Sequence, residues 1–158
     1  PLSAWIPKNF NLSREYSETT GRLELWPCQR GIADAVTDPE IDEITVMKSA
    51  RTGATTILCL ATLAYHVLED PCPIQIVQPT DEDAEDFSVE MLTPMLGDNA
   101  KVAAQFGKSL GRQRDSGNKL SRKTYAGGFV VLTGAQAGRH FRRRNIKVAI
   151  GDELDGWN

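Results

Sequence analysis

The sequence of 158 residues has few cysteines and histidines, and neither type is arranged for metal or nucleophilic chemistry. Cys28, Cys59 and Cys72 are odd in number and lack the spacing of metal ligands, which fits a reducing cytoplasm best. His66 and His140 have no partner ligands nearby in the sequence, so we assign neither to a metal. No Ser-His-Asp or Cys-His arrangement stands out.

Long apolar runs are also missing. The most apolar stretch, residues 57–68, carries Thr62, Tyr65 and His66 and is too short to span a bilayer. No signal peptide opens the chain, and we therefore expect no membrane segment. With 41% apolar and 25% charged residues, the sequence is typical of one soluble globular domain.

Charge is distributed unevenly between the two parts of the chain. Residues 1–100 hold 6 Lys and Arg against 17 Asp and Glu, a formal charge of -11, whereas residues 101–158 hold 12 against 4, a formal charge of +8. The overall formal charge is only -3. A basic part of this kind indicates a polyanionic partner.

The most informative stretch is residues 43–56, where a short apolar run stops, a turn follows and an apolar helix begins. This is the layout of a phosphate-binding loop, whose usual pattern is a glycine, four residues and then Gly-Lys-Ser/Thr. Gly53 and Thr55 fit the pattern, but Ala54 replaces the lysine. Lys48 stands where the pattern has its first glycine, and its flexible stem is long enough to reach the β- and γ-phosphates.

A second segment near the end of the chain also fits a nucleotide-binding site. Residues 148–151 form an apolar run that ends in two adjacent carboxylates, Asp152 and Glu153. Asp152 is suited to holding Mg²⁺, and Glu153 to orienting and deprotonating an attacking water. Because each element predicts where the other lies in the fold, the pair favours nucleotide hydrolysis over a purely structural turn.

We therefore predict an ATP and Mg²⁺ site in which Lys48 offsets phosphate charge and Thr55 ligates the metal directly. Arg51 has two equal interpretations: it adds charge at the transition state, or it pairs with a neighbouring acid. The predicted nucleotide-contacting residues are Gln29, Lys48, Ser49, Ala50, Arg51, Thr52, Gly53, Ala54, Thr55 and Thr56.

Two further features have competing interpretations. The side chain of Gln29 can donate to and accept from adenine. Without the phosphate loop, we would favour a glutamine on the solvated face of a helix. The acidic run of residues 81–86 could bind a metal, but acids in the first turn of a helix capped by Thr80, with Asp83 three residues on, explain it without one. We favour the helix start.

The pattern of apolar runs and turns predicts an α/β fold of the P-loop NTPase type, with a three-layer arrangement and a mostly parallel central sheet. The ligand is expected at the carboxyl ends of the strands. Residues 1–24 are expected to form an extended arm held by Trp5, Ile6 and Phe10, and residues 97–118 to be loop with some helix. The expected helices are a short one that starts after Pro27 and runs to Val36, residues 55–68 and the segment after Thr80. The expected strands are residues 44–47, 73–79, 119–125, 128–133 and 146–150.

A basic cluster follows the last glycine-rich turn. Its arginines form a solvated face, contact a phosphate backbone, or serve the nucleotide of a neighbouring subunit. We prefer contact with the DNA backbone without base specificity. The residues are Arg139, Arg142, Arg143 and Arg144.

Several short motifs, in this order, give the chain a family resemblance. They are residues 48–53, the segment Gln78-Pro79-Thr80-Asp81 with Asp83-Ala84-Glu85-Asp86-Phe87, then Gly134-Ala135 and Asp152-Glu153-Leu154. From about Trp26 onward the chain resembles the large terminase subunit of lambda-type tailed phages, the GpA-like family. A lysine at the front of the loop, in place of the usual one, is typical of terminases.

The resemblance implies an ATPase of RecA-like topology that drives double-stranded DNA through a portal protein into a procapsid in the host bacterial cytoplasm. It also implies a small terminase subunit as partner and a ring oligomer when active. Lys48 and Thr55 match the Walker A roles, Asp152 and Glu153 the Walker B metal and base roles, and Gln29 approximately an adenine-contacting position. Lambda-type loops often carry a further lysine or an aromatic near positions 54–56, where this chain has Ala54 and Thr56.

On this interpretation residues 25–158 are a truncated ATPase domain, because the coupling motif and the nuclease domain would follow Asn158. DNA cutting is then not expected of these residues. Two other functions stay open: a helicase-like RecA-fold ATPase that acts on nucleic acid, and a nucleotide-binding module without hydrolysis.

Overall fold

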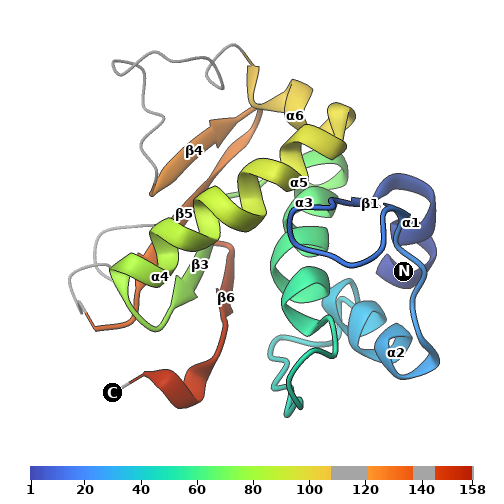
Figure 1. Ribbon diagram of the computed structural model, residues 1–158, viewed down its shortest axis with the longest axis horizontal. Coiled ribbons are helices and arrows are strands. Elements are labelled where there is room, and N and C mark those ends of the chain that lie inside the picture. The colour runs from blue at the N-terminus through green and yellow to red at the C-terminus, as the bar shows by residue number, and fades with distance from the viewer. Residues whose placement is uncertain (108–120, 137–144, 158) are drawn as a thin grey trace.

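A four-stranded sheet forms the centre of the computed structural model, which describes residues 1–107, 121–136 and 145–157 (Figure 1). Its strands, in spatial order, are β4 (Arg122–Tyr125), β5 (Gly128–Gly134), β3 (Ile74–Gln78) and β6 (Val148–Gly151). β3 is parallel to β5 and β6, whereas β4 is antiparallel to β5. The expected α/β class with a mostly parallel sheet is confirmed.

The middle strand β3 is buried on both faces, as an inner parallel strand should be. On one face Ile74 and Ile76 join the hydrophobic core with Leu132 of β5. On the other face the Nε2 atom of Gln75 donates a 2.9 Å hydrogen bond to Oγ1 of Thr133. The strand expected over residues 73–79 is thus confirmed.

The apolar helix expected over residues 55–68 is confirmed as two consecutive segments, the π-helical η1 (Thr56–Ala61) and α3 (Thr62–Glu69). Thr62 Oγ1 donates to the carbonyl oxygen of Ile57 at 3.0 Å, which satisfies a hydroxyl inside the core. The buried side chains are Ile57, Cys59, Leu60, Ala61, Thr62, Leu63, Ala64, His66 and Val67. No helix among the described residues is long and apolar enough to cross a membrane.

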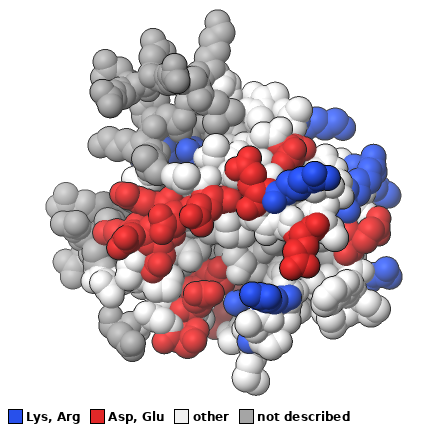
Figure 2. Space-filling model, in the orientation of Figure 1, with Lys and Arg blue, Asp and Glu red and all other residues white. Residues whose placement is uncertain are grey.

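A row of short helices follows β3 and lies against the sheet (Figure 1). It contains α4 (Asp81–Asp86), η2 (Phe87–Leu92), α5 (Thr93–Asp98) and α6 (Ala100–Gln105). The predicted cap is confirmed: Asp83 N donates to Thr80 Oγ1 at 3.0 Å, and Thr80 N donates back to Asp83 Oδ2 at 3.0 Å. Acidic side chains form a band over α4 in Figure 2, as expected where acids offset the positive end of a helix dipole.

The predicted hairpin is confirmed in β4 and β5, whose tight turn places Tyr125 opposite Gly128. The predicted last strand is confirmed in β6. For the segment of residues 97–118, the structure shows helix α6 within the part that it describes, and residues 108–118 lie outside that part.

The extended arm expected at the N-terminus is wrong for its first residues, which form α1 (Leu2–Asn9). Leu2 and Ile6 are fully buried against the core. Side chains at the end of α2 (Pro27–Val36) cap this helix: Leu2 N donates to Thr37 Oγ1 at 3.0 Å, and Ser3 N donates to Asp34 Oδ1 at 2.9 Å. The connection between the two helices includes the short antiparallel strands β1 (Asn11–Leu12) and β2 (Gly21–Arg22).

The strand expected over residues 44–47 is also wrong, because none of residues 41–49 is in a strand and Met47 is 99% exposed. A strand is stable only when its backbone N–H and C=O groups have a partner strand. Here no strand among the described residues pairs with residues 44–47. A cavity of about 1110 Å³ has both this segment and β6 in its wall.

Candidate functional site

The glycine loop leads directly into a helix. A helical turn begins at Ala54, and Ile57 N donates to the carbonyl oxygen of Gly53 at 3.1 Å. Arg51 and Gly53 both have left-handed φ values, 59° and 73°. Turns of this kind direct successive backbone N–H groups toward a common point and suit the binding of an anion.

Gln29, on α2, holds this loop with one end of its side-chain amide and caps the start of its own helix with the other. Its Nε2 atom donates to the carbonyl oxygen of Thr52 at 2.8 Å, and its Oε1 atom accepts from Trp26 N at 2.8 Å. A Cβ atom at Gly53 would lie 3.2 Å from Gln29 Nε2, so the glycine also permits this close approach. The contact between α2 and the loop was not expected from the sequence.

The two predicted carboxylates lie at the carboxyl end of β6. Asp152 is only 8% exposed, and its N–H donates to the carbonyl oxygen of Val77 at 3.0 Å, which continues the ladder with β3. Glu153 is exposed, and its N–H donates to Asp152 Oδ1 at 3.1 Å. Trp157 folds back from η5 (Leu154–Gly156), and its indole N–H donates to the carbonyl oxygen of Asp152 at 3.0 Å. A Cβ atom at Gly151 would meet the Trp157 ring at 2.9 Å.

The structure brings the displaced lysine and the acidic pair to one cavity. Lys48, Ala50, Asp152 and Glu153 all lie in its wall. The other loop residues predicted to contact nucleotide, and Gln29, are not in the wall of this cavity.

The pKa of Cys59 depends on the charges of both Lys48 and Asp152. Burial raises the pKa of this thiol well above its usual range, the charge of Asp152 raises it further, and the charge of Lys48 lowers it. Cys59 lies about one helical turn beyond Thr55, which places the predicted metal-ligating hydroxyl at the same end of the helix.

Two of the predicted site residues have unfavourable backbone conformations. Arg51, with φ of 59°, and Glu153, with φ of 49°, are the two non-glycine residues with positive φ in the described part of the chain. Such a conformation costs on the order of 1–3 kcal/mol and is concentrated at functional sites. The strain thus coincides with the loop and with the predicted base.

The polar groups present are of the kind that Mg²⁺ prefers. In the part of the chain that the structure describes, no three His, Cys, Asp or Glu side chains form a metal cluster. Mg²⁺ is commonly held by one or two carboxylates together with substrate phosphates and water. Asp152 and the hydroxyl of Thr55 are donors of this type, so they fit a metal that enters with a nucleotide.

One polar residue at this end of the sheet was assigned no role from the sequence. Gln78, the last residue of β3, is 6% exposed, and its Nε2 atom has no hydrogen-bond partner within the part of the chain that the structure describes. A glutamine that ends an apolar strand was the available signal. The residues predicted to contact DNA, Arg139, Arg142, Arg143 and Arg144, lie outside the described part of the chain, as does His140.

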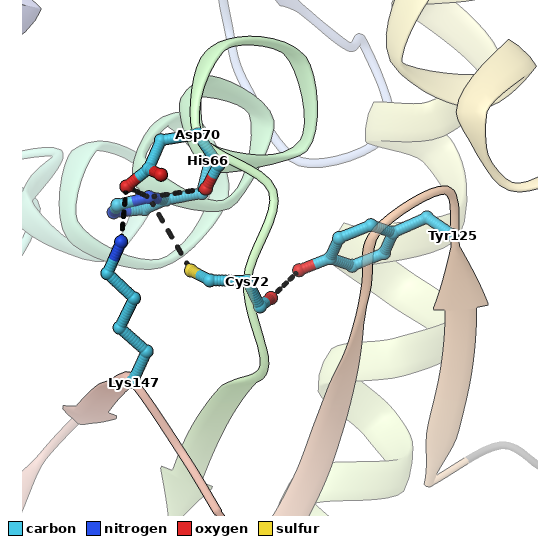
Figure 3. A network of polar contacts seen from close by, with 5 residues as sticks. All are labelled: His66, Asp70, Cys72, Tyr125 and Lys147. Carbon is cyan, nitrogen blue, oxygen red and sulfur yellow. Dashed lines mark hydrogen bonds and ion pairs between the residues drawn. The ribbon is translucent and has the colours of Figure 1, made fainter.

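A separate polar network lies at the opposite ends of the strands, where Cys72 precedes β3 and Lys147 precedes β6 (Figure 3). Lys147 Nζ contacts Asp70 Oδ2 at 2.8 Å, and this ion pair lowers the pKa of Asp70. His66 Nδ1 lies 3.7 Å from Cys72 Sγ and 3.6 Å from Asp70 Oδ2. The Tyr125 hydroxyl donates to the carbonyl oxygen of Cys72 at 2.6 Å. This network joins α3 to three strands, and His66, Asp70 and Lys147 also lie in the wall of the cavity that contains Lys48 and Asp152.

The network makes stability depend on pH through His66. Burial lowers the pKa of this imidazole below its usual 6.5, against the opposing effect of Asp70. As pH falls through about 6.5, the unfolded chain therefore takes up a proton that the folded chain resists, and folding becomes less favourable. We expect His66→Gln to reduce the loss of Tm on acidification, measured by thermal unfolding across this range. Equal pH dependence in the two proteins would remove His66 from this effect.

The fold and this arrangement define a class: an α/β protein with a mostly parallel sheet and a candidate phosphate-binding site at the carboxyl ends of its strands. The chain belongs to the family described as phage terminase large subunit gpA, ATPase domain, whose sequence model matches residues 17–158. The resemblance stated from the motifs is thus confirmed.

Two curated relatives agree with this assignment. The chain is 34% identical over 157 residues to the terminase large subunit of Escherichia phage lambda, and 33% identical over 156 residues to that of Enterobacteria phage P21. These alignments cover 98% and 97% of this chain but 24% of each relative, so the chain spans about a quarter of the length of the relatives it matches. No solved structure matches it.

Proposed function

We propose that this chain is the ATP-hydrolysing part of a phage terminase large subunit and that it drives viral double-stranded DNA into a procapsid. The observation that carries the proposal is the shared cavity, whose wall contains Lys48 from the loop together with Asp152 and Glu153, which follow β6. A cation that neutralises phosphate, a buried carboxylate and an exposed carboxylate are the groups that phosphoryl transfer to water requires.

Each group has a distinct role in this proposal. The N–H groups of residues 50–55 surround the phosphates, and the ammonium of Lys48 offsets their charge. Asp152 and Thr55 are the residues that would hold Mg²⁺, which polarises the phosphate oxygens when it is bound. Glu153, exposed at the cavity wall, accepts a proton from the attacking water. Arg51 either adds charge near the γ-phosphate or pairs with a neighbouring acid.

We place this site within a P-loop fold of RecA-like topology, in which residues 25–158 belong to the ATPase domain and residues 1–24 precede it. Gln29, whose amide already holds the loop, then borders the adenine. The arginines of residues 139–144 contact the DNA backbone, and a small terminase subunit, a portal protein and further copies of the chain complete the motor in the host cytoplasm.

The test uses the full-length protein, purified with its small subunit. Packaging predicts that ATP is hydrolysed and that DNA becomes protected from nuclease only when procapsids are present. Separation of DNA strands without procapsids would instead favour a helicase-like ATPase. Binding of ATP without turnover would favour a nucleotide-binding module.

A further inference from the structure

Gln78 has a buried side chain whose donor atom is unused. The residue is 6% exposed, yet its Nε2 atom has no hydrogen-bond partner among the described residues. Buried polar atoms are nearly always paired, so an unpaired one in a well-packed strand requires a physical reason. Gln75, three residues earlier on the same strand and 4% exposed, shows the usual case, because its Nε2 atom donates to Thr133 Oγ1 at 2.9 Å.

The strand register places Gln78 beside Asp152. Val77 is the register partner of Gly151, and Asp152 N donates to the carbonyl oxygen of Val77, so the next level of the ladder holds Gln78 and Asp152. Register partners in parallel strands direct their side chains to the same face of the sheet. Gln78 therefore shares its face with Asp152, and both follow the core-facing positions of their strands.

Helix η1 carries a buried thiol whose pKa is raised by that burial and by Asp152. The charge of Asp152 acts on the thiol of Cys59, which is buried in η1. The first residues of this helix come directly from the glycine loop. Gln78 thus lies next to the carboxylate proposed to hold Mg²⁺, at the end of the sheet where the loop begins its helix.

We propose that Gln78 is a positioning residue for Asp152: its Nε2 atom donates a hydrogen bond to the Asp152 carboxylate when Mg²⁺ and nucleotide occupy the site. This inference rests on the proposed function. One carboxylate oxygen, Oδ1, already accepts from Glu153 N at 3.1 Å. A donor from the neighbouring strand fixes the carboxylate plane from a second direction, and metal-ligating carboxylates are ordinarily held by such outer hydrogen bonds.

The proposal explains why an unpaired donor is kept inside the protein. For stability alone, an apolar side chain of the same length would serve better at this position, because it has no polar group to desolvate. The amide of Gln78 then contributes to function only when Mg²⁺ and nucleotide are bound, whereas the amide of Gln75 stabilises the fold itself.

The test compares Gln78→Met with Gln75→Met in the full-length protein, because methionine keeps the length of the side chain and removes the amide. For Gln78→Met we expect Tm to be unchanged or raised by about 2–8 °C. The Mg²⁺ concentration for half-maximal binding of a non-hydrolysable ATP analogue should rise about 10- to 100-fold, with binding in EDTA unchanged. For Gln75→Met we expect a lower Tm, because Thr133 loses its partner, and an unchanged Mg²⁺ midpoint.

A double variant tests whether Gln78 affects Mg²⁺ binding through Asp152. In the Asp152→Asn background, Gln78→Met should produce no further change in the Mg²⁺ midpoint, because its only partner is already altered. An unchanged midpoint for Gln78→Met in the otherwise wild-type protein would overturn the inference, as would a full additional effect in the Asp152→Asn background. Failure of the wild-type protein to bind the analogue would instead overturn the proposed function.

Discussion

Glu153→Gln is expected to leave ATP binding intact and to lower ATP turnover by about 10²- to 10⁴-fold, the usual contribution of a general base. Glutamine keeps the shape of the side chain but cannot accept the proton of the attacking water. Glu153 is exposed and its side chain has no described structural role, so the fold should be preserved. The measurements are steady-state ATP hydrolysis and equilibrium binding of a nucleotide analogue, both in the full-length protein.

Asp155→Asn is the matched control for this variant. Asp155 is an exposed carboxylate two residues further along the chain, and its replacement changes the net charge by the same amount. We expect its turnover to stay near the wild-type value. Wild-type turnover in Glu153→Gln would remove Glu153 from the mechanism and move the base elsewhere.

Lys48→Ala is expected to lower ATP turnover by about 10²- to 10³-fold, because a preorganised charge that stabilises the phosphates is lost. The side chain of Lys48 is exposed, so little packing should be lost with it. The measurements are the KM for ATP and kcat, which separate loss of binding from loss of transition-state stabilisation. Lys101→Ala on α6 removes the same charge from an exposed position outside the cavity and serves as the control.

A double variant tests the idea that the lysine has moved along the loop. Ala54 occupies the position where the usual pattern has its lysine, so Lys48→Ala with Ala54→Lys should recover part of the lost activity. Full activity of the single variant Lys48→Ala would contradict the displaced lysine. Recovery in the double variant would show that the phosphate pocket accepts the charge from either end of the loop.

The elements that the sequence predicted correctly are those with local causes. β3 is an apolar run closed by a proline, α3 ends before Pro71, and the β4–β5 hairpin turns at residues 126–127. In each case the apolar period and the turn residues lie within the element or beside it.

The errors have non-local causes. Residues 44–47 have the composition of a strand but lack a neighbouring strand among the described residues, and pairing is not encoded in a single segment. The helix α1 contains Pro7 and has few sequence signals, but burial of Leu2 and Ile6 against the core and the caps from α2 stabilise it. Tertiary contacts therefore determined the secondary structure of both segments.

The candidate site was predicted in part for the same reasons. The residue types of the loop and of Asp152 and Glu153 indicated their chemistry, and Lys48 lies in the wall of the same cavity as the acidic pair. The hydrogen bond from Gln29 to Thr52 and the unpaired donor of Gln78 depend on which strands and helices become neighbours. A single sequence does not contain that information in a local pattern.

Gly151 has no functional group, yet the position of the proposed base, Glu153, depends on it. The indole of Trp157 rests against the bare backbone at this position, and even an alanine methyl group would push the ring outward. The indole N–H of that ring donates to the carbonyl oxygen of Asp152. Displacement of the ring would therefore break this hydrogen bond and shift the turn of residues 152–157, which contains Glu153. Gly151 thereby lets Trp157 bind the carbonyl of Asp152, the residue directly before the proposed base.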